Sequence, residues 1–237
     1  MIITFPDKQS NIAELSIDGT PVNYRIPPIT GTYSECFAES NYTNEIIRAT
    51  GREIVAYVYG ALVNRKNEWA DQEIIKFPTQ NDLRVPKVLT IIPKNGGKKF
   101  GDLEGAMIVD GDLNGEGIAM KTIIPADLTD WELSDEGIFR KNGRVVVPYD
   151  KWCKNQWDEN NGAVIAIFDG KEYATSLAKI AKNSGRGKPF WKVDPVQIQR
   201  PEKMVPVVNG YADGRIGIIC VNRGYSRDGC AVRILKQ

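Results

Sequence analysis

The stretch Asn209-Gly-Tyr-Ala-Asp-Gly-Arg-Ile-Gly-Ile-Ile-Cys-Val-Asn-Arg-Gly-Tyr-Ser-Arg-Asp228 lies near the end of a chain of 237 residues. It is rich in Gly, Tyr, Arg, Asn and Asp. That mixture is typical of binding loops, in which tyrosine and arginine supply rigid contact area and small polar residues supply adaptable hydrogen bonds. A terminal hairpin with an ordinary polar turn would have a similar composition, so composition alone leaves both interpretations open.

Three short apolar runs, separated by glycines, lie before, within and after this stretch. They cover residues 205–208, 216–221 and 230–235. Runs of this length, bounded by turn residues, predict strands. We therefore expect the chain to end in three strands joined by polar turns.

The spacing of Asn209-Gly210-Tyr211, Asp213-Gly214, Gly217, Ser226 and the closing Gly229-Cys-Ala-Val-Arg233 resembles the end of C-type-lectin-fold proteins of the formylglycine-generating-enzyme type. Within that group it is most similar to the variable proteins of diversity-generating retroelements, whose final strands and loops carry a patch diversified at adenine positions. Two departures are visible. Tyr211 stands where tryptophan is usual, and Cys230-Ala231 replaces a Gly-Phe pair.

The resemblance implies a non-catalytic scaffold with a variable C-terminal region at about 205–237, which binds a protein or glycan ligand. Adenine diversification of asparagine codons reaches a limited set of residue types, and many residues in this region belong to it. The implied ligand-binding residues are Tyr211, Asp213, Arg215, Ile216, Ile218, Cys220, Asn222, Arg223, Tyr225, Ser226, Arg227 and Asp228.

The absence of histidine excludes most familiar hydrolase mechanisms. The chain has 31 Lys plus Arg, 30 Asp plus Glu and no His. It therefore lacks the usual general base near neutral pH and the Ser-His and Cys-His nucleophilic pairs.

The four cysteines, Cys36, Cys153, Cys220 and Cys230, form no C-x-x-C pair, which argues against zinc. They are expected to be free thiols or small buried residues, with a Cys220–Cys230 bridge as the alternative. No cofactor is indicated.

The rest of the sequence predicts a single α+β domain over residues 1–237, with two helices packed on small antiparallel sheets. No secretory signal is expected, because the amino terminus lacks a basic stretch followed by a long apolar one. No membrane-spanning run is expected, because no stretch of eighteen apolar residues occurs. Helices are expected at 43–64 and 173–182. Strands are expected at 12–17, 22–26, 85–92, 105–109, 118–124, 137–140, 144–147 and 163–168, with Asn142-Gly143 as a hairpin turn.

An alternative function would use the acidic segment Asp110-Gly-Asp112-Leu-Asn114-Gly115. This segment matches the first half of a calcium loop, and it would serve a carboxylate-dependent or divalent-metal-dependent hydrolase or lyase. Lys121 stands where a closing glutamate should be, so a cation would need Glu104 or Glu116. A hairpin turn explains the segment as well and is preferred, so no metal site is expected.

A basic and aromatic window at residues 179–192 offers a third class of function. Cations that hold phosphates, next to rings that stack on bases, are typical of surfaces for single-stranded nucleic acid. Lysines that complement the end of a helix, followed by a turn into a buried Phe190-Trp191 pair, explain the window more simply. Nucleic acid is therefore a disfavoured partner.

Overall fold

The computed structural model describes residues 3–4, 12–17, 20–64, 82–94, 103–112, 114–153, 158–184, 190–193, 200–210, 216–221 and 229–236. Within these residues the strands are β1 (Ile3–Thr4), β2 (Ile12–Ile17), β3 (Thr20–Gly31), β4 (Ile46–Arg48), β5 (Asp82–Arg84), β6 (Lys87–Ile92), β7 (Ala106–Gly111), β8 (Glu132–Leu133), β9 (Phe139–Lys141), β10 (Arg144–Pro148), β11 (Phe190–Lys192), β12 (Glu202–Gly210), β13 (Ile216–Val221) and β14 (Gly229–Leu235). The helices are α1 (Tyr33–Phe37), α2 (Gly51–Asn64), α3 (Gly162–Ile167) and α4 (Lys171–Ser184), with single turns of 3-10 helix η1 (Glu39–Asn41), η4 (Gly117–Ala119) and η5 (Tyr149–Lys151).

All of these strands belong to one large sheet, in the order β1-β2-β3-β14-β5-β12-β6-β7-β10-β9-β8, with β4, β11 and β13 attached at the side. The α+β class is confirmed, but the expectation of small antiparallel sheets is wrong. The sheet is continuous, and the pairs β11/β13 and β5/β14 are parallel. Small separate sheets do not form because β12 pairs with strands of both halves, β5 in one and β6 in the other.

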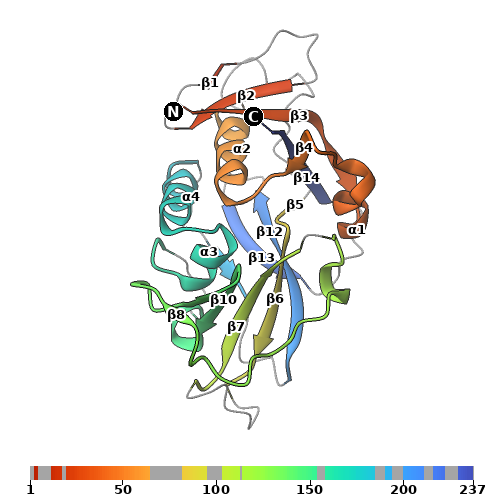
Figure 1. The fold of residues 1–237 in the computed structure, drawn as a ribbon. Helices are drawn as coiled ribbons and strands as arrows, with labels where there is room; N and C mark the ends of the chain where they lie inside the picture. Colours follow the sequence, from red (N-terminus) through yellow and green to blue (C-terminus); the bar gives the residue numbers. More distant parts are fainter. Residues whose placement is uncertain are drawn as a thin grey trace.

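α2, α3 and α4 cover one face of this sheet, and α1 packs on β3 and β14 at the opposite face (Figure 1). α2 packs on β2 and β14, α3 on β7 and β10, and α4 on β13. The main core lies between these two layers, and it includes the fully buried aromatic side chains of Tyr57, Trp152 and Phe168. The two long helices match the two that the sequence predicts. None of the described helices is long and apolar enough to cross a membrane.

The two strands expected at 12–17 and 22–26 pair with each other, but the second is longer than expected. It begins at Thr20, which pairs with Ile17. The strand continues past Pro27 and Pro28 to Gly31, because its last residues pair with the start of β14. The prolines lie where that ladder shifts register, and a shift of this kind tolerates residues that lack an N–H.

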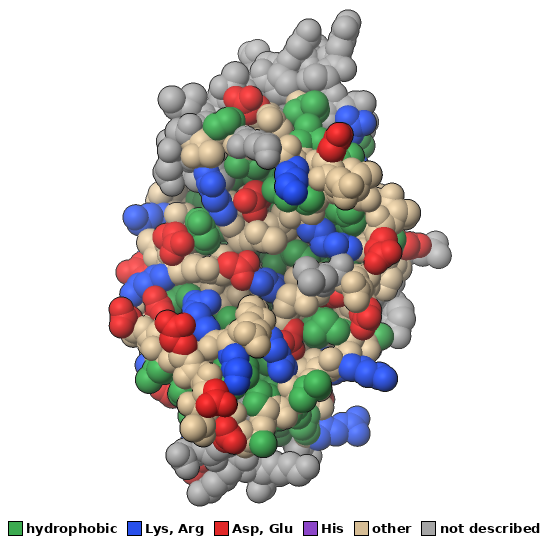
Figure 2. Space-filling model, viewed as in Figure 1, with side chains coloured by type: hydrophobic (Ala, Val, Ile, Leu, Met, Phe, Trp, Pro, Cys, Tyr) green, Lys and Arg blue, Asp and Glu red, His purple; other side chains and the backbone are tan. Residues whose placement is uncertain are grey.

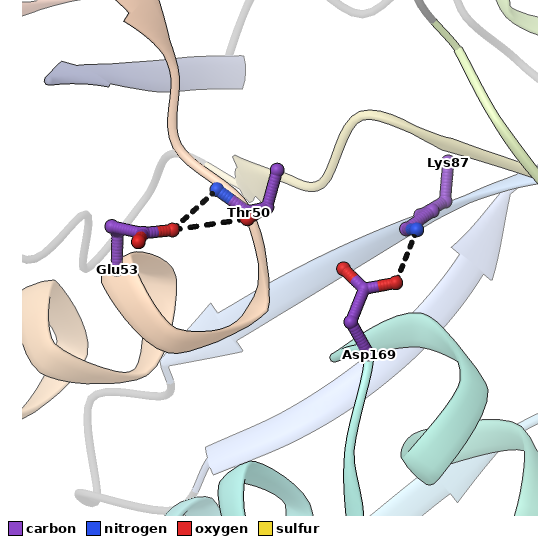
Figure 3. A network of polar contacts seen from close by, with 4 residues as sticks. All are labelled: Thr50, Glu53, Lys87 and Asp169. Carbon is purple, nitrogen blue, oxygen red and sulfur yellow. Dashed lines mark hydrogen bonds and ion pairs between the residues drawn. The ribbon is translucent and has the colours of Figure 1, made fainter. Parts of the chain in front are cut away.

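The predicted helix at 43–64 begins only at Gly51. Residues 46–48 form β4 instead, because they pair with Leu235, Ile234 and Arg233 of the distant strand β14. At the start of α2 the backbone N–H and the hydroxyl of Thr50 both donate to the Glu53 carboxylate at 3.0 Å. This contact closes the first turn of the helix (Figure 3).

Two of the predicted strands adopt other structures. The apolar run at 163–168 forms the buried helix α3, because the Asn161 carboxamide oxygen accepts from the N–H groups of Ala163 and Val164 and starts a helix there. A continuous apolar run suits a buried helix as well as a buried strand. The run at 118–124 is irregular after η4, because the Asp112 carboxylate accepts from the N–H groups of Glu116 and Gly117 and turns the chain.

The other predicted elements are confirmed, with shifted ends. Asn142 has φ of 50° and joins β9 to β10 in the manner of a two-residue hairpin turn. β7, β6 and α4 lie at 106–111, 87–92 and 171–184, and the three C-terminal strands are β12, β13 and β14. Asp169 lies between α3 and α4, and its Oδ1 forms an ion pair of 2.5 Å with Nζ of Lys87 on β6 (Figure 3). This contact joins the helix layer to the sheet.

The contact between the start of α2 and the end of α3 gives a test of this packing. A Cβ added at Gly51 would lie 1.8 Å from the backbone oxygen of Phe168, so α2 would have to move away from α3. We expect Gly51→Ala to lower the free energy of unfolding by about 2 kcal/mol in urea titrations, although alanine is normally the better helix former.

The matched control is Gly111→Ala on β7, where an added Cβ meets nothing within 4 Å. This variant should unfold at nearly the wild-type urea concentration. Equal stability of the two variants would contradict the described packing of α2 on α3.

Candidate functional site

Of the three C-terminal strands, β12 and β14 lie in the middle of the sheet, and β13 is attached beside β12. β12 pairs with β13 along one edge, and along the other with β6 and then with β5. β14 pairs with β3, β4 and β5. The predicted binding residues therefore lie on, or directly follow, strands that are held on both sides.

Most of the predicted ligand-binding residues lie outside the described residues. These are Tyr211, Asp213, Arg215, Asn222, Arg223, Tyr225, Ser226, Arg227 and Asp228. The remaining three, Ile216, Ile218 and Cys220, lie on β13.

The prediction that Ile216 and Ile218 contact a ligand is wrong. Their side chains are 1% and 0% exposed, and they pack in the main core. Cys220 is partly buried against the same core cluster, and burial raises the pKa of its thiol well above the usual value. Alternate residues of a strand point to the same face, so these three side chains share the face that the helices cover. The sequence does not show which face is buried, because Ile219 and Val221 make the other face apolar as well.

The segments 211–215 and 222–228 are anchored by main-chain pairs. Gly210 pairs with Ile216 across the first segment. The second segment starts after Val221, which pairs with Val205, and ends at Gly229, which pairs with Gly31. Both segments are therefore held at each end by regular strand pairing.

Neighbouring strands show which of these anchors share one end of the sheet. Val208 pairs with Leu83, and Leu83 pairs with Cys230, so these three residues form one row across β12, β5 and β14. Gly229 is one residue from this row, and Gly210 is two residues from it in the same direction along the sheet. The end of the second segment is thus anchored near both ends of the first segment.

Arg84 supports the anchor at Gly229. Arg84 is only 2% exposed, and its Nη2 donates to the Gly31 carbonyl at 3.2 Å. A Cβ added at Gly229 would lie 1.9 Å from Nε of Arg84, so only glycine allows this approach. The guanidinium also lies 5.9 Å from the centre of the Tyr33 ring, which gives it a cation–π contact.

Cys36 of α1 lies at the same anchor. Its Sγ is 3.8 Å from the Gly229 carbonyl oxygen, 3.6 Å from that of Gly31 and 3.7 Å from that of Ile29. Burial raises the pKa of this thiol to about 11, so the thiol keeps its one proton and can donate it to any one of these three carbonyls. None of the four cysteines forms a disulfide, so the Cys220–Cys230 bridge is absent.

Sequence reasoning missed Arg84, Cys36 and Tyr33 as supports of this anchor. The available signal was Arg84 itself, a charged residue between Leu83 and Val85 in a short apolar run. A charge inside a buried strand needs a partner nearby.

Both aspartates of the acidic segment are engaged by donors of the protein. Asp110 is paired with Arg144 at 2.5 Å, and the Asp112 carboxylate is occupied by two backbone N–H groups. Glu104 forms an ion pair with Lys94, and Glu116 is exposed. Among the described residues, no three His, Cys, Asp or Glu side chains are grouped so as to hold a metal ion. The hairpin turn expected at this segment is wrong, because residues 118–124 form no strand and β7 pairs with β6 and β10 instead.

The basic window divides between two elements. Lys179 and Lys182 are exposed on α4, whereas residues 190–192 form β11, which pairs with β13. Residues 185–189 lie outside the described residues.

Comparisons with known proteins add one similarity. No family model matches the chain, and no curated protein sequence matches it. A solved structure described as "Accommodation of massive sequence variation in Nanoarchaeota by the C-type lectin fold" is similar with a TM-score of 0.43 and 14% identity, covering 96% of this chain and 98% of that chain. At this TM-score the similarity assigns no family to the chain.

The protected thiol at the Gly229 anchor can be tested chemically. Because its pKa is about 11 instead of 9.0, Cys36 has about a hundredfold less thiolate at pH 8 than an ordinary cysteine. We expect iodoacetamide to label Cys36 in the native protein at least a hundredfold more slowly than in urea, as measured by mass spectrometry of its peptide.

Cys153, which is only partly buried, is the internal reference for reagent access. Labelling of Cys36 should accelerate as the pH rises towards 11. Native Cys36 that reacts as fast as Cys153 at pH 8 would show that the described anchor is wrong.

Proposed function

We propose that this chain is a non-catalytic binding protein of the C-type-lectin type, which recognises a protein or glycan ligand through segments 211–215 and 222–228. The observation that carries the proposal is the anchoring of both segments by paired strands at the centre of the sheet. A scaffold that fixes the ends of a loop lowers the entropy lost on binding. The composition of these segments, rich in Tyr, Arg, Asn and Ser, suits such a role.

The register of the anchors divides the proposed contact residues into two groups. Gly210, Ile216 and Gly229 lie at one end of the sheet, so segment 211–215 and the end of segment 222–228 are expected to form one surface. Val221 lies five residues beyond Ile216, about 17 Å along β13 at ~3.3 Å per residue. Asn222, which follows Val221, is therefore expected at the margin of that surface.

Each residue type has a role in the proposed surface. Aromatic residues act as anchors, arginines as charged or stacking contacts, and small polar residues as a hydrogen-bonding rim. In that order, the proposed residues are Tyr211 and Tyr225; Arg215, Arg223 and Arg227; and Asp213, Asn222, Ser226 and Asp228. Ile216, Ile218 and Cys220 are left out because their side chains face the core.

A binding role also fits the state of the acidic groups. A divalent-metal hydrolase would need carboxylates that point at a common site, but Asp110 and Asp112 are occupied by protein donors. With no histidine in the chain, the described residues provide no assembled acid–base pair in this region. The C-terminal segments are therefore the better candidate for function.

The proposal predicts that Tyr211→Ala and Tyr225→Ala abolish ligand binding without changing the fold. Ligands are first selected on the wild-type chain from a displayed peptide library and from a glycan array. Affinity for each selected ligand should fall at least tenfold in both variants, because a central aromatic contact is worth about 2 kcal/mol or more. The melting temperature should change by less than 2 °C, on the order of a surface substitution.

The matched control is Leu133→Ala on β8, a side chain that is 61% exposed and far along the sheet from β13. This variant should keep wild-type affinity. If both tyrosine variants unfold, the residues belong to the core and the proposed surface is wrong. Ligands that bind all three variants equally would also contradict it.

A further inference from the structure

A cleft of about 450 Å³ lies between the end of β7, the β9–β10 turn and the segment that follows η4. Its lining side chains are those of Asp110, Met120, Lys121, Ile123, Asn142 and Arg144, with the backbone of two glycines. None of these residues belongs to the C-terminal surface. The volume is within the range of pockets that hold small molecules.

Arg144 is fixed in this cleft with one nitrogen left over. Its Nε donates to Oδ1 of Asp110 at 2.5 Å, and its Nη2 donates to the Ile123 carbonyl at 2.7 Å and lies 3.5 Å from Oδ2 of Asp110. The Nη1 group has no hydrogen-bond partner among the described residues, although an arginine can donate five hydrogen bonds. The Arg144 side chain is 28% exposed, so a ligand can reach it.

The charges in the cleft leave an excess positive charge. Asp110, whose side chain is 6% exposed, is neutralised by Arg144. Lys121 is exposed and forms no ion pair with a described residue. Lys203 lies nearby and donates to the Met120 carbonyl. Figure 2 shows basic, acidic and hydrophobic side chains interspersed over the lower half of this view, where β6 and β7 lie.

The remaining lining is apolar. Met120 packs its inner side against the cluster that contains Val88 and Val205. Ile123 is 77% exposed, an unusual position for a large aliphatic side chain, and Ile124 beside it is 44% exposed. Arg144 holds the Ile123 carbonyl and so fixes this exposed residue at the rim of the cleft.

We propose that this cleft binds a small organic carboxylate with a short apolar chain. Nη1 of Arg144 and the ammonium group of Lys121 donate to the carboxylate, and the chain lies on Met120 and Ile123. One free guanidinium nitrogen and one ammonium match the two oxygens of a carboxylate. The third oxygen of a phosphate would instead face the carboxylate of Asp110, and these two negatively charged groups would repel each other. A carboxylate is therefore favoured over a phosphate.

The probe is sodium isovalerate, titrated into the full chain and followed by calorimetry. We expect saturable binding with one site. Isoamyl alcohol, which has a similar chain and no charge, should bind at least tenfold more weakly. Isoamyl phosphate should also bind more weakly, and tighter binding of the phosphate would overturn the assignment to a carboxylate. Failure of isovalerate to saturate would overturn the site itself.

Two exposed positions allow variants that keep the fold. Lys121→Gln should weaken isovalerate about tenfold, because a charge-assisted hydrogen bond is lost. Ile123→Ser should weaken isovalerate severalfold but leave the weaker binding of acetate unchanged. The matched control is Lys179→Gln on α4, an exposed lysine outside the cleft. Equal effects of the two lysine variants would overturn the proposal.

Binding of isovalerate in the cleft is expected to be independent of the proposed surface at 211–228. Tyr211→Ala should bind isovalerate as the wild type does. A loss of isovalerate binding in that variant would overturn the cleft as a separate site, whereas a failure of the C-terminal surface to bind peptides or glycans leaves the isovalerate result unaffected.

Discussion

The backbone hydrogen bonds of β12 are the constraint on which the rest of the sheet depends. One edge of this strand pairs with β13, and the other edge is divided between β6 and β5. It therefore joins the half of the sheet that contains β7 and β10 to the half that contains β3 and β14 (Figure 1). The strand pairs of the first half all lie within residues 87–148, whereas the second half and the junction between the two halves need the last part of the chain. Folding must close long loops, which is slow and makes the structure cooperative.

This dependence on distant partners explains which elements could be predicted from the sequence and which could not. The β9–β10 hairpin was predictable, because the conformation of Asn142-Gly143 is set by the two residues themselves. Residues 46–48 were assigned to a helix because their strand pairing is with β14, almost two hundred residues later. The run 163–168 gave no period that separates a strand from a helix, and the Asn161 cap decides between them.

The same division applies to the candidate site. Strand alternation places Ile216, Ile218 and Cys220 on one face, but the run 216–221 is apolar on both faces, so only the structure shows that this face lies against the main core. The support of Gly229 by Arg84 could not be found in this way, because the contact joins residues 145 positions apart and depends on the parallel pairing of β5 with β14. A charged residue in a buried strand indicates a tertiary contact, but the sequence does not show which residue it contacts.

The position of the anchors bears on how such a surface can change. Gly210 and Ile216 hold the first segment by a main-chain pair, and Gly229 is held by its strand pairing and by Arg84 and Cys36, which come from elsewhere in the chain. None of these anchoring contacts uses a side chain from 211–215 or 222–228. If the proposed surface is correct, substitutions within the two segments are therefore expected to leave these contacts in place. A scaffold with that property can present many different surfaces on one unchanged fold.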